Sequence, residues 1–358
     1  MLYIVIIAGG KGERFWPRSV KDRPKQFQHI VTEKTMIQET FNRVYPDIEK
    51  ERIFIAAGGH LKKVILEQLP EIREENLIIE PMGKNTAPAI GLASLIISRR
   101  DPDAHIAVLS ADHVVHTRED FLHALQDASK AAESGYIVTF GISPSRPATE
   151  FGYIEVDRLL EESFEHEVFT VKRFREKPSH EQAEEFIREG NFLWNSGMFI
   201  FNARSLLEDM STYMPELHRG LMRIGDALHT DEEERVKAEE FEKFESVSID
   251  YGVMEKSDRL ACLKPKFFWD DVGSWGALQR HKVPDESGNI IQGNVAAVDS
   301  HDNIVIGDEG SIVAIIGMKD TICVKEGERV LICHKSADQK IKEALKEMRS
   351  HPENSKYL

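Results

Sequence analysis

The chain has 358 residues, of which 41% are hydrophobic and 30% are charged, and its formal net charge is −15 at pH 7. This composition is that of a globular protein, and the length allows one large domain plus a small one, or two ordinary ones. No apolar run reaches the roughly 18 residues that would span a membrane. The acidic total argues against a general nucleic-acid surface, so an anionic ligand would have to be held by local cations or by a metal ion.

The cysteine pattern and the start of the chain both favour a cytoplasmic location. Cys262, Cys323 and Cys333 are odd in number and lack metal-ligand spacing, which suits a reducing environment. The chain enters a strand at once, without the basic region and apolar core of a secretory signal. We therefore expect a cytoplasmic protein with neither a membrane nor a nucleic acid as its partner.

The first stretch, from Tyr3 to Phe27, reads YIVIIAGGKGERFWPRSVKDRPKQF. Its β-branched run predicts a strand buried on both faces, and three glycines then allow the backbone to approach a ligand closely. From Lys11 to Lys25, six residues are Lys or Arg and two are acidic, a local charge of +4 (6 − 2). A glycine loop followed by clustered cations suits a polyphosphate. The alternative is an ordinary turn with a solvated basic loop.

The spacing of Gly9, Gly10 and Gly12 fits neither G-x-x-x-x-G-K-[ST] nor G-x-G-x-x-G. Instead, AGGKGERFWPRS followed shortly by PKQF resembles the N-terminal signature of sugar-nucleotide pyrophosphorylases, and its Trp-Pro and Pro-Lys-Gln-Phe elements look like the mannose-1-phosphate guanylyltransferase branch. The resemblance implies nucleotide binding by Ala8, Gly9, Gly10 and Gly12. It also implies catalytic phosphate contacts from Arg14 and Lys25.

Up to about residue 140, short β-rich runs alternate with helical patterns. We predict strands at 52–56, 77–79, 106–109 and 136–140, and helices at 35–45, 60–69, 86–98 and 119–134. This alternation predicts an α/β fold with a mostly parallel sheet and helices on both faces, and the resemblance makes it glycosyltransferase-A-like. Ligands in such sheets bind beyond the carboxyl ends of the strands.

The strand at 77–79 ends in EPMGKNTAPA, which starts at Glu80. Asn85 or Thr86 can cap the following helix, and capping alone could explain both residues. The segment is also similar to the one that lines the nucleotide pocket of the guanylyltransferases. A carboxylate can accept hydrogen bonds from the N–H edge of guanine, which adenine lacks. We therefore hypothesise that Glu80 selects the base.

The strand at 106–109 ends in Ser110-Ala111-Asp112-His113. A carboxylate at the tip of a central strand suits Mg²⁺, although it could equally cap the next turn. The resemblance assigns Asp112 to the metal and places Ser110 and Ala111 against the nucleotide. His113 and His116 have no carboxylate or cysteine nearby that would complete a metal site, so we interpret both as loop residues.

The motifs FGYI, EKP and WNSGMF follow in the second half of the chain. Singly, each could be an exposed strand end or a plain turn. Together they occur in the order and spacing of the family's sugar-phosphate site. By that resemblance Glu176 and Asn195 bind mannose hydroxyls, Gly152 gives backbone contacts, and Lys177 meets the phosphate of the sugar. These side chains supply the donors and acceptors that a polyol and a phosphate require.

Two later motifs carry acidic residues. SIDYGVMEK, at 248–256, is similar to a family segment, but we assign it no function, and Asp250 could equally cap a helix. WDDVGSW, at 269–275, places two carboxylates between tryptophans, where burial is costly unless they are paired or bound to metal. The resemblance gives the metal to Asp271, so that Asp112 and Asp271 hold one Mg²⁺. It leaves Asp270 as supporting structure.

From about residue 288, short apolar runs separated by turn signals predict a small β-solenoid, as in the family's C-terminal appendage. We predict a nucleotidyltransferase catalytic domain at 1–285 and a solenoid-like domain at 286–358, with a helix at 337–349. We expect the solenoid to serve packing and subunit contact in a homodimer. Bifunctional family members carry a further isomerase domain, for which this chain ends too early, so we expect no isomerase activity.

The motifs together imply that GTP and α-mannose 1-phosphate give GDP-mannose and diphosphate, with Mg²⁺ as the cofactor. Two alternatives stay open. An enzyme for another sugar 1-phosphate would share all the catalytic residues. A noncatalytic scaffold subunit would bind nucleotide sugar, but the chain keeps the metal carboxylates and the Arg/Lys cluster, which disfavours this alternative.

Overall fold

The computed structural model describes residues 1–160 and 164–358. The chain divides into two compact units. The first, which we call the sheet unit, comprises the described residues of 1–9, 40–111 and 115–270. The second, which we call the solenoid unit, comprises 10–39, 112–114 and 271–358.

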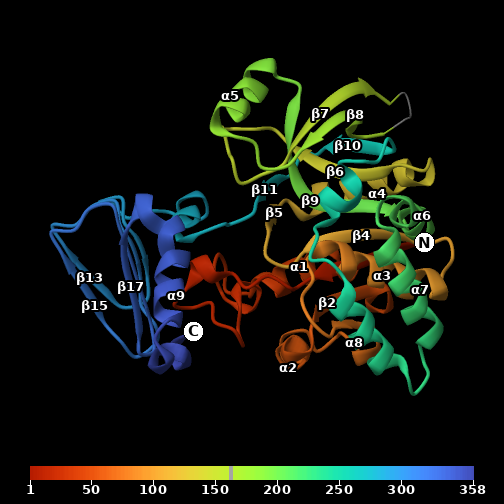
Figure 1. The fold of residues 1–358 in the computed structure, drawn as a ribbon. Coiled ribbons are helices and arrows are strands. Elements are labelled where there is room, and N and C mark those ends of the chain that lie inside the picture. Colours follow the sequence, from red (N-terminus) through yellow and green to blue (C-terminus); the bar gives the residue numbers. More distant parts are fainter. Residues whose placement is uncertain (161–163) are drawn as a thin grey trace. The chain divides into compact units, whose positions relative to one another are not determined.

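A large sheet dominates the sheet unit (Figure 1). Among the described residues it has nine strands, in the order β3-β2-β1-β4-β9-β6-β10-β8-β7. The first four are parallel, as are β6 and β10, whereas the other pairings are antiparallel. The strands are β1 (Leu2–Ile7), β2 (Ile53–Gly58), β3 (Leu77–Glu80), β4 (His105–Ser110), β6 (Ile137–Ile142), β7 (Tyr153–Leu159), β8 (Glu167–Arg175), β9 (Phe192–Asn202) and β10 (Leu260–Lys264). Two further short strands are β5 (Val114–His116) and β11 (Phe268–Asp270).

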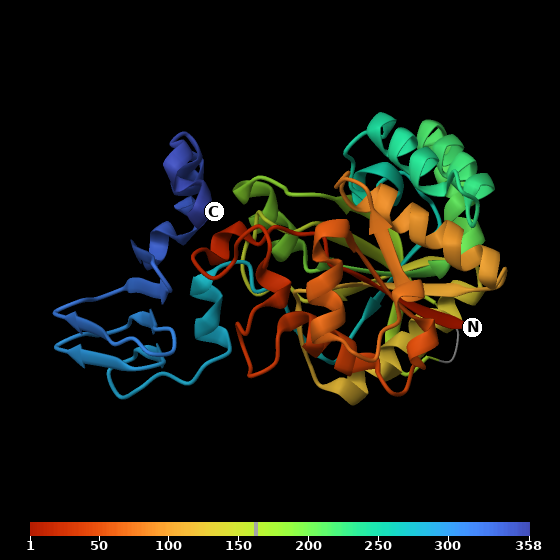
Figure 2. The ribbon, with the colours of Figure 1, turned by 90° about the horizontal axis from the view of Figure 1, so that it is seen from below.

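Helices cover both faces of this sheet (Figure 2). Side chains alternate along β1, so Val5 packs in a cluster with residues of α3 and α6, while its neighbours Ile4 and Ile6 are buried on the opposite face. α4 contacts β4, β6 and β9. These features confirm the predicted α/β class. The helices are α1 (Met36–Val44), α2 (Lys62–Gln68), α3 (Thr86–Arg100), α4 (Arg118–Glu133), α5 (His180–Glu189), α6 (Ala203–Tyr213), α7 (Pro215–Ala227) and α8 (Glu233–Lys243).

The solenoid unit stacks short parallel strands. Ile290 lies opposite Ile304, which in turn lies opposite Ile322. At the same corner the side-chain oxygen of Asn289 accepts from the Asn303 backbone at 3.0 Å, and that of Asn303 accepts from the Thr321 backbone at 2.9 Å. This ladder satisfies buried polar groups from coil to coil and confirms the predicted solenoid. The strands are β12 (Ile290–Gln292), β13 (Val295–Val298), β14 (Ile304–Ile306), β15 (Val313–Ile316), β16 (Thr321–Glu326) and β17 (Arg329–His334), and the helix is α9 (Ile341–Arg349).

The core of the solenoid unit joins residues that are far apart in sequence. Phe15 and Trp275 belong to the same buried cluster as Ile304 of β14 and Ile341 of α9. The compact units therefore cut the chain differently from the predicted boundary at residue 285, because segments 10–39 and 271–285 pack with the solenoid. Across residues 1–160 and 164–358, no helix combines the length and apolarity that crossing a membrane requires.

Candidate active site

The glycine loop of the solenoid unit packs against the basic segment that follows it in the chain. Gly12 has φ +58°, and a Cβ there would lie 2.3 Å from Cβ of Lys25. The left-handed conformation and this close approach both require glycine. Gln26 donates to the Gly10 carbonyl at 3.1 Å and Ser19 donates to the Lys11 carbonyl at 2.8 Å. The loop is therefore fixed by side chains of the basic segment that follows it.

Lys25 is the centre of this arrangement. Its ammonium donates to the carboxylate of Asp112 at 3.0 Å, to the Asp112 carbonyl at 2.9 Å and to the Asp271 carbonyl at 2.7 Å. Its side chain is only 5% exposed, and the ammonium lies over the Phe15 ring, 5.4 Å from the centroid. Three acceptors match the three N–H bonds of a lysine. Lys25 thus holds together the two segments that carry the predicted metal carboxylates.

A cavity of about 380 Å³ opens beside Lys25. Arg14 lines it, donates to the Gly273 carbonyl at 3.4 Å, and has a buried Nε with no hydrogen-bond partner among the described residues. A guanidinium with an unused donor suits a phosphate. Lys342 of α9 and His113 also line this cavity. His113 was expected only in a loop, yet it contributes to this cavity. Lys342 was not expected here, because nothing in the local pattern of a terminal helix indicates which cavity a side chain lines.

The carboxylates of this cavity fit magnesium. Among the described residues, no group of three or more His, Cys, Asp or Glu side chains could hold a metal ion, but Asp112 and Asp271 line the cavity together. Mg²⁺ in nucleotide enzymes takes one or two carboxylates and completes its octahedron with water and substrate phosphates. The two residues therefore match the donor set expected for an ion that arrives with a nucleotide.

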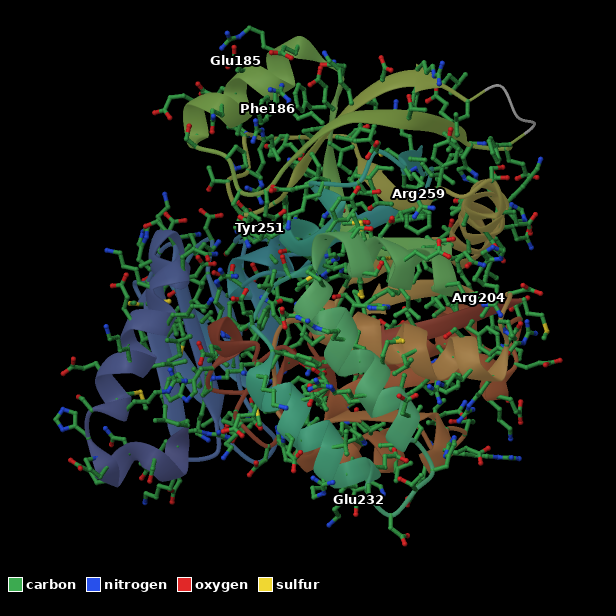
Figure 3. All side chains as sticks on the ribbon, turned by 45° about the vertical axis from the view of Figure 1, so that its right-hand side comes forward. Glu185, Phe186, Arg204, Glu232, Tyr251 and Arg259 are labelled. Atoms are coloured by element: carbon green, nitrogen blue, oxygen red, sulfur yellow. The ribbon has the colours of Figure 1, made fainter. Side chains whose placement is uncertain are left out.

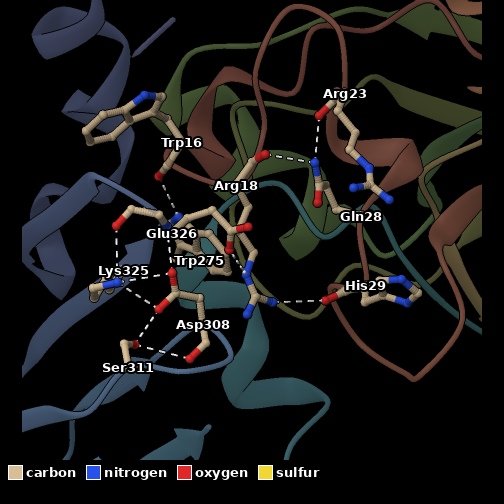
Figure 4. A network of polar contacts seen from close by, with 11 residues as sticks. Trp16, Arg18, Arg23, Gln28, His29, Trp275, Asp308, Ser311, Lys325 and Glu326 are labelled. Carbon is tan, nitrogen blue, oxygen red and sulfur yellow. Dashed lines mark hydrogen bonds and ion pairs between the residues drawn. The ribbon is translucent and has the colours of Figure 1, made fainter. Parts of the chain in front are cut away.

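The loop after Asp271 is anchored to the solenoid (Figure 4). The Trp275 indole donates to the Trp16 carbonyl at 3.0 Å, and Asp338 accepts from the Ser274 hydroxyl and from the Gly276 backbone. Figure 4 also shows Arg18 paired with Glu326 at 3.3 Å. The loops beside Lys25 thus depend on contacts with residues that the sequence places in a separate appendage.

A second cavity, of about 540 Å³, lies in the sheet unit. It is lined by two sets of predicted residues, Asn85 and Thr86 for the nucleotide, and Glu176 and Lys177 for the sugar phosphate. Asp250 and its neighbours from the segment without an assigned function line it too. Tyr251, labelled in Figure 3, is exposed at this cavity. Motifs that are distant in the chain therefore converge on one cavity, which we call the sugar cavity.

Capping and cavity lining are both visible at the start of α3. The Asn85 side chain accepts from the Thr86 backbone N–H at 2.8 Å, as a cap does. The Thr86 hydroxyl accepts from the backbone N–H of Ile249 at 2.9 Å, and Ala87 donates to the Val247 carbonyl at 3.1 Å. The two explanations weighed for Asn85 and Thr86 are therefore compatible.

The residues predicted to bind sugar surround Gly152. A Cβ at Gly152 would lie 2.4 Å from the Glu176 carboxylate and 3.4 Å from Cβ of Asn195. Asn195 is buried, and its carbonyl oxygen accepts from the Thr139 hydroxyl at 2.9 Å. Burial, followed by the nearby Asp250 carboxylate, raises the pKa of Glu176 above its usual range. The absence of a side chain at Gly152 thus leaves room for the Glu176 carboxylate.

The remaining predicted residues lie at strand ends of the sheet unit. Glu80 ends β3 and is buried, and burial raises its pKa to about 7. Ser110 ends β4, and Ala8 and Ala111 continue β1 and β4, where Ala111 donates to the Ile7 carbonyl at 3.1 Å. Gly9, which follows Ala8, is exposed, and a Cβ there would meet nothing within 4 Å. The backbone at the end of β1 is therefore open to a ligand.

Comparison with known families shows the fold and the general activity. Residues 3–287 match the Nucleotidyl transferase family. Residues 293–348 match a domain described as the MannoseP isomerase/GMP-like beta-helix domain. The first matched range ends at residue 287 and the second begins at residue 293.

Three relatives illustrate the similarity. The chain is 36% identical to the alginate biosynthesis protein AlgA of Pseudomonas aeruginosa, over 96% of this chain and 71% of that protein. It is 35% identical to mannose-1-phosphate guanylyltransferase of Klebsiella pneumoniae, over 96% and 73% of the two chains. A crystal structure of mannose-1-phosphate geranyltransferase from Thermus thermophilus superposes with a TM-score of 0.87 at 32% identity, covering 97% of this chain and 99% of the other.

Proposed function

Because the chain belongs to the nucleotidyl transferase family, we propose that it transfers GMP from GTP to mannose 1-phosphate and releases diphosphate. The general activity, a nucleotidyltransferase acting on a sugar phosphate, follows from the family and from relatives at about 35% identity. The observation that supports the finer assignment is the sugar cavity, where Asn85 and Thr86 lie with Glu176 and Lys177. Nucleotide and sugar-phosphate motifs thus share one cavity.

The reaction needs no general base. A phosphate oxygen of the sugar phosphate attacks the α-phosphorus of GTP, a P–O bond forms, the bond to the bridging oxygen breaks, and diphosphate departs with that electron pair. The nucleophile is already largely dianionic at pH 7, since its second pKa is about 6. The barrier lies in bringing anions together, because two unit charges about 4 Å apart repel by roughly 4 kcal/mol at an effective dielectric of about 20.

The residues around Lys25 would offset this repulsion. Arg14 and Lys342 line the 380 Å³ cavity, where they would bind the β- and γ-phosphates of GTP. Lys25 would keep its bonds to Asp112 and Asp271 and would stabilise the transferring phosphate through its charge. These two carboxylates would hold Mg²⁺, which when bound neutralises and aligns phosphate oxygens. Positioning and charge stabilisation, and not proton transfer, are the contributions we propose for this chain.

The base and the sugar would be recognised by the glycine loop and by residues of the sheet unit. Ala8, Gly9, Gly10 and Gly12 would present backbone to the nucleotide, together with Ser110 and Ala111. Glu80 would accept from the N–H edge of guanine. Glu176 and Asn195 would serve the sugar hydroxyls and Lys177 the sugar's phosphate, with Gly152 leaving them room.

The test is diphosphate release from GTP and mannose 1-phosphate with Mg²⁺. Parallel reactions contain ATP or UTP, glucose 1-phosphate, or no metal. We expect release with GTP, mannose 1-phosphate and metal together. Release with another sugar phosphate would keep the mechanism and change the substrate, whereas no release with any pair would favour the scaffold alternative.

We also propose a cytoplasmic homodimer. The solenoid leaves large apolar side chains exposed on β13, β15 and β17, namely Val298, Ile316 and Ile332 at 51%, 70% and 66%. A second copy of the chain would cover such a face. All three cysteines are free thiols, which agrees with a reducing compartment. Light scattering on the wild type and on Ile316→Lys tests the dimer, which the substitution should split into monomers.

A further inference from the structure

The segment 248–256 had no assigned function, yet it is built into the sugar cavity. It contains a π-helix at Asp250–Met254, a conformation that is rare and frequent at functional sites. Backbone hydrogen bonds from Ile249 to the Thr86 hydroxyl and from Ala87 to the Val247 carbonyl tie it to the start of α3. The position of Asp250 is therefore fixed by its own helix and by a neighbouring one.

Asp250 is linked to a residue that the family resemblance assigns to the sugar. The Asn195 amide donates to the Asp250 carboxylate at 2.9 Å. The carbonyl oxygen of the same amide is occupied, because the Thr139 hydroxyl donates to it at 2.9 Å and the Gly197 backbone at 3.1 Å. These bonds fix which way the amide faces. Asn195 is buried, whereas Asp250 lines the cavity.

Two carboxylates therefore border the same cavity. Burial raises the pKa of both Asp250 and Glu176, and the proximity of Asp250 contributes to the shift at Glu176. Lys177 lies 3.3 Å from the Glu176 carboxylate and is largely exposed. A ligand carrying several hydroxyl groups supplies the donors that such acceptors need when water is displaced.

We propose that Asp250 accepts a hydrogen bond from a ring hydroxyl of the sugar phosphate and so determines which sugar the enzyme takes, with Asn195 holding its carboxylate in place. This inference rests on the proposed function. Asp250 becomes a second acceptor for the pyranose beside Glu176. Discrimination by a fixed acceptor that lines the cavity is strong because an analogue without the matching hydroxyl leaves this acceptor without that hydrogen bond.

The test combines Asp250→Asn with a panel of mannose 1-phosphate analogues, each lacking one hydroxyl. Asparagine keeps a carbonyl oxygen that can accept from Asn195, so the fold is retained, but the charge is lost. We expect wild-type kcat/KM to fall by about 10- to 100-fold for one analogue of the panel. In the variant, the penalty for that analogue should shrink to less than about threefold, while the KM for GTP stays unchanged.

The outcomes separate the inference from the function on which it rests. If the wild type turns over no sugar 1-phosphate, the proposed function fails. If the wild type is active and Asp250→Asn keeps every deoxy penalty at its wild-type value, Asp250 only supports Asn195 and the inference is wrong. Asp258→Asn, at an exposed position of the same region, is the matched control and should leave the panel unchanged. Thermal unfolding of both variants confirms that the fold is intact.

Discussion

The two cavities differ in how their charged groups are paired. Around Lys25, cation and carboxylate already bind each other, and the ammonium has three protein acceptors within 3.0 Å. In the sugar cavity, burial raises the pKa of both Glu176 and Asp250, and the nearby Asp250 carboxylate adds to the shift at Glu176. Phosphates carry charge, so the charged groups of a phosphate site must be paired and held rigidly before the ligand binds. The ring hydroxyls of a sugar phosphate carry only dipoles, so carboxylate acceptors suit them, whereas Lys177 would meet the charged phosphate. The comparison predicts that substitutions in the first cavity reduce kcat, whereas those in the second change the KM for sugar.

The largest effect should come from Asp112→Asn. The side chain keeps its size and an acceptor for Lys25 but loses the charge that would hold Mg²⁺. We expect kcat to fall by about 10³-fold, which corresponds to about 4 kcal/mol of lost transition-state stabilisation, with little change in the free energy of unfolding. Steady-state kinetics across a range of Mg²⁺ concentrations measures this. Asp22→Asn, at an exposed position, is the control, and a raised KM with normal kcat would contradict the prediction.

Lys25→Met should reduce both activity and stability. Removing the ammonium leaves the Asp112 carboxylate and two carbonyls without their buried donor, so we expect unfolding to become easier by about 3 kcal/mol and kcat to fall by about 10²-fold. Chemical denaturation and kinetics are measured in parallel with Lys21→Met, whose side chain is exposed. A variant with wild-type stability would show that Lys25 does not hold the two loops together.

Gly152→Ala should test the difference between the two cavities, because it should weaken the binding of the sugar phosphate and leave the binding of GTP unchanged. The added methyl would lie 2.4 Å from the Glu176 carboxylate and must displace it. We expect the KM for mannose 1-phosphate to rise about tenfold, with the KM for GTP unchanged. Gly59→Ala is the matched control, because its methyl meets only an Ile79 methyl at 3.4 Å. Equal changes in both KM values would show that Gly152 does not serve the sugar alone.

A further effect concerns Glu80 and pH. Burial raises the pKa of this carboxyl to about 7, so the folded chain holds a proton that the unfolded chain releases near pH 4.5. The free energy of stabilisation that comes from this bound proton is fully present below pH 4.5 and is lost as the pH rises toward 7. Relative to the wild type, Glu80→Gln should therefore be more stable at pH 8 by about 2–3 kcal/mol and equally stable at pH 4.5.

The same residue should affect the affinity for guanine. If the ionised carboxylate binds the base, the KM of the wild type for GTP should improve severalfold relative to that of Glu80→Gln between pH 6 and pH 8. GTP itself titrates in the same way in both experiments, so its contribution cancels when the KM of one protein is divided by the KM of the other. A ratio that stays constant with pH, or an unchanged preference for GTP over ATP, would disprove the base-selecting role.

Local patterns predicted most of the sheet unit. The expected helices at 86–98 and 119–134 correspond to α3 and α4 within two residues at each end, because periodicity and capping are local properties. The helices α6 and α7 were missed, although Asn202 accepts from two backbone N–H groups as a cap and Pro215 begins α7. Asn202 and Pro215 are therefore the sequence signals that mark where these two helices begin.

Tertiary assembly limited the prediction of the site. Sequence placed Asp112 and Asp271 in one metal site, and the structure has them lining one cavity with Lys25. Lys342 and Asp250 were not predicted to line these cavities, because only packing between distant segments decides which cavity they face. A residue that contributes one charge from a terminal helix leaves no periodic trace in the sequence.

The shared core of Phe15 with the solenoid strands has a consequence for synthesis. Residues 10–39 emerge from the ribosome long before Trp275, Ile290 and Ile304, which complete their core. At about 5–20 residues per second, the interval between Phe15 and Ile290 lasts about 15 to 55 s. During that time the glycine loop and the basic segment lack the partners that bury them, so a nascent chain would be most vulnerable to proteases and aggregation at its own N-terminal signature.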